Sequence, residues 1–99
     1  MTKSEMVAAL NEKQAWLPGK KVKIDYGAEG VVLLDGVAGS ASEEDGDADT
    51  TIKISWDDWQ ALAEGELDGM TAFVQGKLKV EGDMGNAMQL QGVFAKLRG

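Results

Sequence analysis

Residues 70–97, which decide the fold of this chain, read MTAFVQGKLKVEGDMGNAMQLQGVFAKL. Residues 70–75 are largely apolar and predict a short helical turn. Residues 76–82 alternate, with Leu78 and Val80 on one side and charged side chains on the other, as in a strand with one buried face. The period of the apolar residues then changes, which predicts that the chain ends in a helix.

The final helix, expected from about Asp83, carries a wide apolar surface. Placed at 100° steps, five apolar residues span an arc of about 120°. They are Ala87, Leu90, Val93, Phe94 and Leu97. Met84 and Met88 lie beyond this arc and widen the apolar surface to roughly half of the cylinder. Because one flat sheet covers only a stripe, we expect a second apolar surface against this helix, either another helix or a bound apolar molecule.

The upstream residues predict a helix, a run of strands and a second helix. Thr2 and Glu5 can form a capping box for a helix that continues to about Ala15. Strands are expected at 20–26, 31–35, 36–41 and 50–55. Ser55 opens another helix, which Gly65 ends. Each strand has an apolar face that only the helices can cover, so the fold class is α+β, a two-layer domain with helices packed on one face of a sheet.

The composition limits both the size of the protein and its chemistry. Ninety-nine residues, of which 43% are hydrophobic, predict a single domain over 1–99. The chain has no cysteine and no histidine, which removes thiolate sites, the usual general base and the commonest metal ligand. A Ser-His or Cys-His nucleophile cannot be built, so we expect a protein that is not an enzyme and needs no metal or cofactor.

The charge of the chain excludes further classes. A net charge of −7 argues against nucleic acid as a partner and against unaided adhesion to an anionic membrane. The first residues lack the apolar run of a signal peptide, and no apolar stretch approaches the ~20 residues of a membrane span. We therefore expect a cytoplasmic protein without stable membrane insertion.

The candidate binding residues gather in the carboxy-terminal half. Met70, Met84 and Met88, together with Phe73 and Phe94, offer flexible thioethers and aromatic faces. Such side chains suit a cavity that accepts varied acyl chains. The same residues would also suit an ordinary filled core, and the residue pattern leaves both interpretations open.

Two further candidates also have two interpretations each. Trp59, three residues after Trp56 on a short helix, is either a core residue or part of a cavity rim. Three glutamines, Gln75, Gln89 and Gln91, could contact the head group of a ligand. Gln75, at the turn from helix to strand, has the best case of the three, although a glutamine at a helix end could also bond the backbone.

The charged residues carry weaker hypotheses. The acidic run 43–49 suggests calcium, but an EF-hand loop from Asp45 would need Gly at position 50 and Glu at position 56, where the chain has Thr50 and Trp56. A solvated acidic loop is therefore expected. Five lysines fall on outward strand positions, namely Lys21, Lys23, Lys53, Lys77 and Lys79. They give either a cationic face for an anionic ligand or acidic partner, or cross-strand ion pairs.

The run FVQGKLKVEGDMGNAMQL also resembles a known family, the sterol carrier protein type 2 domain. The family pattern here is roughly F-x-x-G-K-L-K-I-x-G-[ND]-M-G-x-A-M-x-L, and twelve of its eighteen positions match without a gap. The matching residues are Phe73, Gly76, Lys77, Leu78, Lys79, Gly82, Asp83, Met84, Gly85, Ala87, Met88 and Leu90. The chain departs from the family at Asn86, where an apolar residue is frequent, and at Gln89, where Lys is common.

The resemblance implies a mostly antiparallel five-stranded sheet whose helices enclose an apolar tunnel. It implies non-enzymatic lipid binding and transfer, with a fatty acyl, acyl-coenzyme A, sterol-like or isoprenoid ligand. The expected lining is Trp59, Met70, Phe73, Gln75, Met84, Met88 and Phe94. The alternative is an interaction module with a filled core, which would act through homodimerisation or as an accessory subunit of a lipid or quinone pathway.

Overall fold

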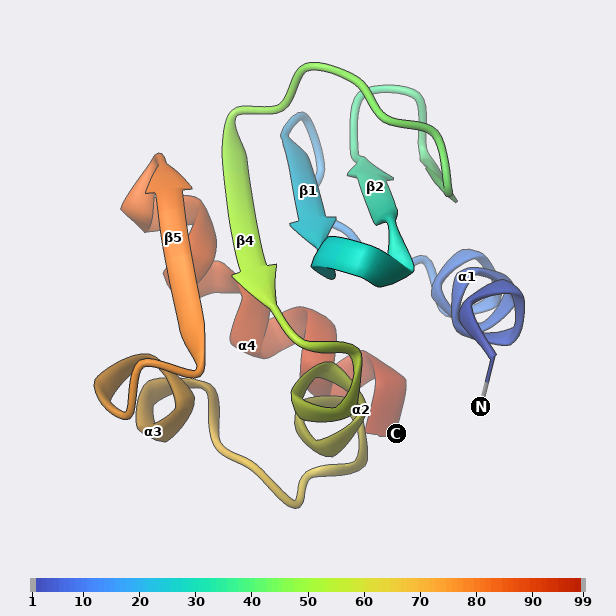
Figure 1. The fold of residues 1–99 in the computed structure, drawn as a ribbon. Helices are drawn as coiled ribbons and strands as arrows, with labels where there is room; N and C mark the ends of the chain where they lie inside the picture. Colours follow the sequence, from blue (N-terminus) through green and yellow to red (C-terminus); the bar gives the residue numbers. More distant parts are fainter. Residues whose placement is uncertain (1, 99) are drawn as a thin grey trace.

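Figure 1 shows the computed structural model, which describes residues 2–98 as a five-stranded sheet with four α-helices. In chain order the elements are α1 (Lys3–Glu12), β1 (Lys21–Asp25), the 3-10 turn η1 (Gly27–Glu29), β2 (Val31–Asp35), β3 (Ser40–Ser42), β4 (Thr50–Ile54), α2 (Trp56–Glu64), α3 (Gly69–Val74), β5 (Leu78–Gly82) and α4 (Met84–Arg98). The predicted α+β class and the five-stranded, mostly antiparallel sheet are confirmed.

The strands follow the order β3-β2-β1-β4-β5. All neighbours are antiparallel except β1 and β4, which run parallel with Val22 opposite Thr50. This one parallel pair joins the amino-terminal hairpin to the carboxy-terminal half in the middle of the sheet. The two edge strands of the sheet therefore come from different halves of the chain, β3 from the amino-terminal half and β5 from the carboxy-terminal half.

One face of the sheet carries the hydrophobic core, and the helices cover it (Figure 1). The alternation in β1 and β4 buries Val22, Ile24 and Ile52 completely, as the sequence predicted. On β2 the opposite face is covered as well. Leu33 is buried outside the core, beneath the acidic loop at Gly46, while Lys23 forms an ion pair with Asp45 in the same loop, with 2.6 Å between the charged atoms.

Helix α1 begins at the predicted capping box and ends earlier than predicted. The Thr2 hydroxyl accepts the Glu5 N–H at 3.1 Å, and a Glu5 carboxylate oxygen accepts the Thr2 N–H at 2.8 Å. The prediction that the helix continues to about Ala15 is wrong, because α1 ends at Glu12 and Gln14 has a φ of 52°. This turn directs Ala15 into the core, which a straight continuation of the helix would not do.

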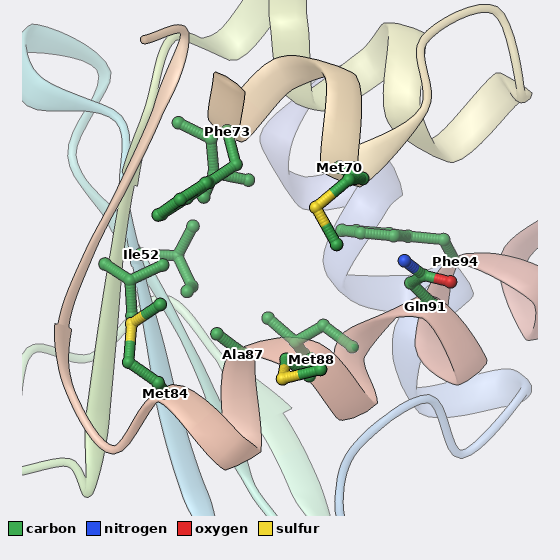
Figure 2. Close-up of a pocket in the computed structure, with 12 residues that line it drawn as sticks. Ile52, Met70, Phe73, Met84, Ala87, Met88, Gln91 and Phe94 are labelled. Atoms are coloured by element: carbon green, nitrogen blue, oxygen red, sulfur yellow. The ribbon is translucent and has the colours of Figure 1, made fainter. Parts of the chain in front are cut away.

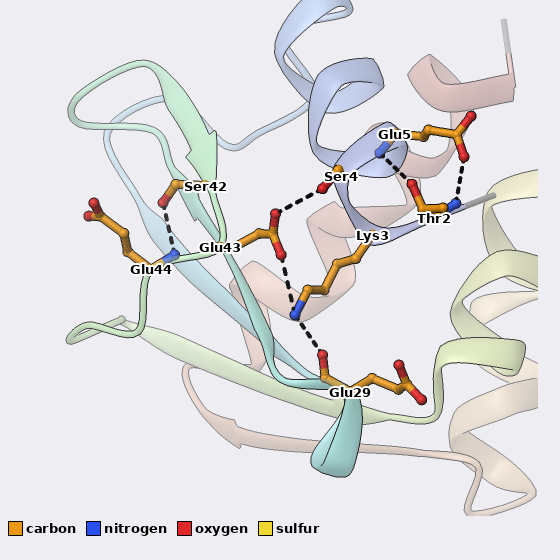
Figure 3. A network of polar contacts seen from close by, with 8 residues as sticks. All are labelled: Thr2, Lys3, Ser4, Glu5, Glu29, Ser42, Glu43 and Glu44. Atoms are coloured by element: carbon orange, nitrogen blue, oxygen red, sulfur yellow. Dashed lines mark hydrogen bonds and ion pairs between the residues drawn. The ribbon is translucent and has the colours of Figure 1, made fainter.

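Polar contacts fasten α1 to the β3 side of the sheet (Figure 3). The Lys3 ammonium donates to the Glu29 carbonyl at 2.6 Å and pairs with the Glu43 carboxylate at 3.3 Å. Further along the helix, the Asn11 side chain donates to the Ala41 carbonyl at 2.9 Å and accepts the Ala41 N–H at 2.8 Å. The amide of Asn11 thus takes the place of a neighbouring strand at the β3 edge.

Helix α2 confirms the predicted start and stop. The Ser55 hydroxyl accepts the Asp58 N–H at 3.1 Å, and Gly65 ends the helix in the left-handed conformation with a φ of 81°. None of the helices within residues 2–98 has the length and apolarity that crossing a membrane requires.

Candidate functional site: an apolar pocket between α3, β5 and α4

A pocket of about 290 Å³ lies between the carboxy-terminal helices and the β4–β5 side of the sheet (Figure 2). Helix α3 and helix α4 frame it, and β4 and β5 form its floor. Its lining residues are Ile52, Gly69, Met70, Phe73, Leu78, Val80, Met84, Ala87, Met88, Leu90, Gln91 and Phe94. No lining residue is ionisable, so the pocket offers an apolar wall with one amide.

Short local interactions place the two framing helices. The Asp68 carboxylate caps α3 by accepting the N–H groups of Met70 at 3.0 Å and Thr71 at 3.2 Å. Between β5 and α4 the chain turns sharply at Gly82, which has a φ of 92°. A side chain at Gly82 would overlap with the Asp49 carbonyl oxygen, so only glycine allows this close approach.

A buried polar contact anchors the first turn of α4 to the sheet. The Asn86 amide donates to the Thr50 hydroxyl at 3.2 Å, and this hydroxyl donates to the Asp83 carbonyl at 2.8 Å. Both Asn86 and Thr50 are buried. The departure from the family pattern at Asn86 therefore lies behind the pocket wall, where its polarity is satisfied by β4.

The pocket is open to solvent on the side of its methionines. Met88 is 67% exposed and Met70 is 52% exposed, although both line the pocket. Leu90 and Phe94, in contrast, are buried at its inner end. The site thus combines a buried apolar interior with a rim of flexible thioethers, and exposed apolar surface of this kind is typical of a binding site.

Five of the seven residues that the sequence singled out line this one pocket: Met70, Phe73, Met84, Met88 and Phe94. Trp59 and Gln75 do not line it. Trp59 is fully buried behind the wall, where its ring meets that of Phe94 edge to face at a centroid distance of 5.2 Å. Gln75 is exposed and ends α3, with its N–H donating to the Thr71 carbonyl.

The polar residue in the lining is Gln91, and not Gln75, which the sequence favoured among the three candidate glutamines. Figure 2 shows it beside Phe94 and Met70. Its spacing could have identified it, because residues 84, 88 and 91 are separated by four and three and so share one helical face. No group of three or more acidic residues within 2–98 is arranged to hold a metal ion.

Comparison with known proteins assigns the family. The model of the SCP-2 sterol transfer family matches residues 4–95. Sterol carrier protein 2 of Gallus gallus is 44% identical over 61 residues, which are 62% of this chain but only 11% of that protein. This chain therefore corresponds to a small part of the length of that relative.

Two solved structures share the fold over most of their length. The solution structure of sterol carrier protein 2 from Aedes aegypti, in complex with the C16 fatty acid palmitate, matches with a TM-score of 0.76 and 20% identity over 93% of both chains. The structure of the ubiquinone synthesis protein UbiJ-SCP2 matches with a TM-score of 0.73 and 18% identity, over 95% of this chain and 93% of that one. The family model, the relatives and the fold agree, and the chain belongs to the SCP-2 sterol transfer family.

Proposed function

We propose that this protein binds a lipid by its acyl chain in the α3–β5–α4 pocket and carries it without chemical change. The observation that carries this proposal is an apolar pocket, free of charged lining residues, whose methionines remain exposed. Membership of a lipid-transfer family and the palmitate bound to the Aedes aegypti relative support the same class of ligand.

The size of the pocket favours a single hydrocarbon chain. At about 290 Å³ it lies at the small end of the range for ligand sites, roughly 300–1,000 Å³. A fatty acid, an acyl-coenzyme A or a linear isoprenoid could insert its tail while its head stays outside. Burial of about ten methylenes supplies on the order of 8 kcal/mol before ordering costs are subtracted. Gln91 then lies at the pocket wall as a neutral donor and acceptor for the polar end of the ligand.

Substitution of Met88 by glutamate tests the placement of the ligand. A carboxylate in the apolar lining would have to lose water when a hydrocarbon chain enters, so Met88→Glu should weaken binding of a fluorescent fatty acid at least tenfold. Val37→Glu is the matched control, because Val37 is 68% exposed, close to the 67% of Met88, and does not line the pocket. Equal binding by both variants, with unchanged circular dichroism, would refute this site.

The exposed rim also favours a second candidate, an accessory module that docks on another chain. Exposed apolar surface is a common feature of interaction sites, and one structural relative is named as a ubiquinone synthesis protein. Native mass spectrometry of the purified protein distinguishes the two functions. A co-purified lipid supports the carrier, whereas a chain that takes up no added fatty acid supports the module.

A further inference from the structure

The two edge strands of the sheet differ in whether their outer backbone groups have hydrogen-bond partners. At the β3 edge, the Asn11 side chain pairs with both backbone groups of Ala41. At the opposite edge, β5 lies outermost (Figure 1). Within residues 2–98, the backbone hydrogen bonds of Leu78–Gly82 are confined to the ladder with β4. An uncovered edge strand of this kind is a template for pairing with another chain.

The charges along β5 are complementary to themselves. Lys77 and Lys79 precede Val80, and Glu81 and Asp83 follow it at the same spacing. In the sequence K-x-K-V-E-x-D, each lysine before Val80 therefore has an acidic residue at the same distance after Val80. Two such strands that run antiparallel around a two-fold axis at Val80 place Lys79 and Glu81, the two charged residues of β5, opposite residues of the other sign.

We propose that a second copy of this chain docks on β5 in this register and extends the sheet across the two-fold axis. Lys79 then faces Glu81 of the partner copy, and Glu81 faces Lys79 of the partner copy. Lys77 and Asp83 lie just outside Leu78–Gly82, so the pairing within the strand rests on Lys79 and Glu81. Opposite charges directly across an antiparallel pair are favourable, and like charges are unfavourable.

The ion pairs within one copy leave the lysines available for this contact. Lys53 already pairs with Glu81 at 3.0 Å on the neighbouring strand. None of the ion pairs within residues 2–98 involves Lys77 or Lys79. Lys79 instead lies directly opposite Lys53 in the β4–β5 register, an unfavourable neighbour that a carboxylate from the partner copy would neutralise.

Other registers of two copies are less favourable. A two-fold axis at Lys79 would place the two copies of Lys79 opposite each other, and an axis at Glu81 would do the same for the two glutamates. A shift by one residue would place Leu78 and Val80 opposite charged residues of the partner copy and put the helices of the two copies on opposite faces of the joined sheet. Only the axis at Val80 combines an apolar inner face with opposite charges on the outer face.

The same arrangement covers the rim of the pocket. A two-fold axis perpendicular to the sheet keeps the helices of both copies on one side, so α3 and α4 of each copy approach those of the other beside the paired strands. Both helices contact β5. They carry five large exposed apolar residues: Met70, Phe73, Val74, Met84 and Met88. A five-residue strand alone is too small for a stable interface of about 1,600 Å², so these residues are required to complete it.

Charge reversal tests the register. The wild-type protein, analysed without lipid by light scattering after size exclusion, should have twice the 10.5 kDa mass of one chain. Lys79→Glu alone and Glu81→Lys alone each place like charges in opposition and should raise the dissociation constant of the dimer at least tenfold. When these two variants are mixed, each glutamate meets a lysine, so a heterodimer should form. The double variant should form a homodimer again.

A matched control distinguishes the effect of the strand register from the effect of the net charge of the chain. Lys20→Glu changes the charge of the chain by the same amount as Lys79→Glu, at an exposed residue outside the strands, and should leave the dimer intact. Circular dichroism verifies that each variant is folded. A monomeric wild type would overturn the proposal, as would a Lys79→Glu protein that remains dimeric or two single variants that do not pair when mixed. None of these outcomes depends on whether the pocket binds lipid.

Discussion

Two buried polar atoms of the core have no hydrogen-bond partner within the described residues, the Tyr26 hydroxyl and the Trp59 indole nitrogen. Tyr26 packs between Trp56 and Trp59, with ring centroids at 5.0 and 6.0 Å. Burial raises the pKa of the Tyr26 phenol well above its ordinary value, so the hydroxyl stays neutral. The aromatic ring contributes to the core, whereas the hydroxyl loses its contacts with water and receives nothing in return.

Removal of the Tyr26 hydroxyl should therefore stabilise the fold. We expect Tyr26→Phe to raise the free energy of unfolding by about 1 kcal/mol, measured by urea denaturation. Thr50→Val is the matched control, because it also removes one buried hydroxyl, but one that bonds both Asn86 and Asp83. That variant should lose about 1–2 kcal/mol. A loss of stability in Tyr26→Phe would mean that its hydroxyl is satisfied in solution.

At the scale of single residues, the sequence predicted residue types better than their exact roles. The five apolar candidates of the final quarter do meet in one pocket, because helical spacing and strand alternation place them on facing surfaces. Trp59 and Gln75 were candidates because of their size and polarity. These properties do not distinguish a residue that lines the pocket from one that lies outside it. Only the crossing of α2 and α4 puts Trp59 behind Phe94.

At the scale of elements, the junction from β5 to α4 determines where the pocket wall begins. Its tight approach to Asp49 requires the absence of a side chain at Gly82. We expect Gly82→Ala to lower the free energy of unfolding by about 1–3 kcal/mol, because the left-handed backbone and the overlap both oppose a methyl group. Gly92→Ala, within α4 and with open space around it, should instead gain about 0.5–1 kcal/mol. Thermal unfolding of the two variants measures this opposite effect.

Helix α1 should respond to acid through its capping box. The hydrogen bond from the Thr2 backbone, and then that from the Thr2 side chain, hold the pKa of Glu5 below its ordinary value. The folded state therefore favours the charged carboxylate. Its contribution is present above the unfolded pKa and is lost as the pH falls through the lower folded pKa.

We expect the stability of the protein to decrease as the pH falls from about 5 to 3. The stability of Glu5→Gln should decrease less than that of the wild type over this pH range. The midpoint of urea unfolding at each pH measures this difference. Glu12→Gln removes a carboxylate from the other end of α1, outside the capping box, and serves as the control. If Glu5→Gln showed the full wild-type dependence on pH, the capping box would contribute nothing to it.

Local patterns predicted the elements, but not how distant strands pair. Alternation and capping residues identified four of the strands and the start of each long helix. The parallel pairing of β1 with β4 has no local signature, because it joins residues 28 apart, such as Val22 and Thr50. The early end of α1 was missed for a related reason, since the position of Ala15 in the core depends on packing against the sheet and not on helical propensity.

The whole molecule divides its apolar residues between a filled core and an unfilled pocket. Tyr26, Trp59 and Phe94 form a continuous aromatic series that fills the space between sheet and helices on one side. The pocket begins on the other side of Phe94. Phe94 therefore packs against the core on one side and lines the pocket on the other. Its ring limits how deeply a ligand can enter.

This limit predicts how binding depends on ligand length. A pocket of about 290 Å³ has room for roughly ten groups of the size of a water molecule, each about 30 Å³, and a methylene is of similar size. In a series of saturated fatty acids, displacement of a fluorescent probe should improve about fourfold per methylene, the equivalent of ~0.8 kcal/mol, and then reach a plateau near that length. Ala87→Leu extends a lining residue into the pocket and should shift the plateau to shorter chains, whereas Ala8→Leu, exposed on α1, should not. An affinity that rises without a plateau, or a plateau that Ala87→Leu does not shift, would place the hydrocarbon chain elsewhere on the molecule.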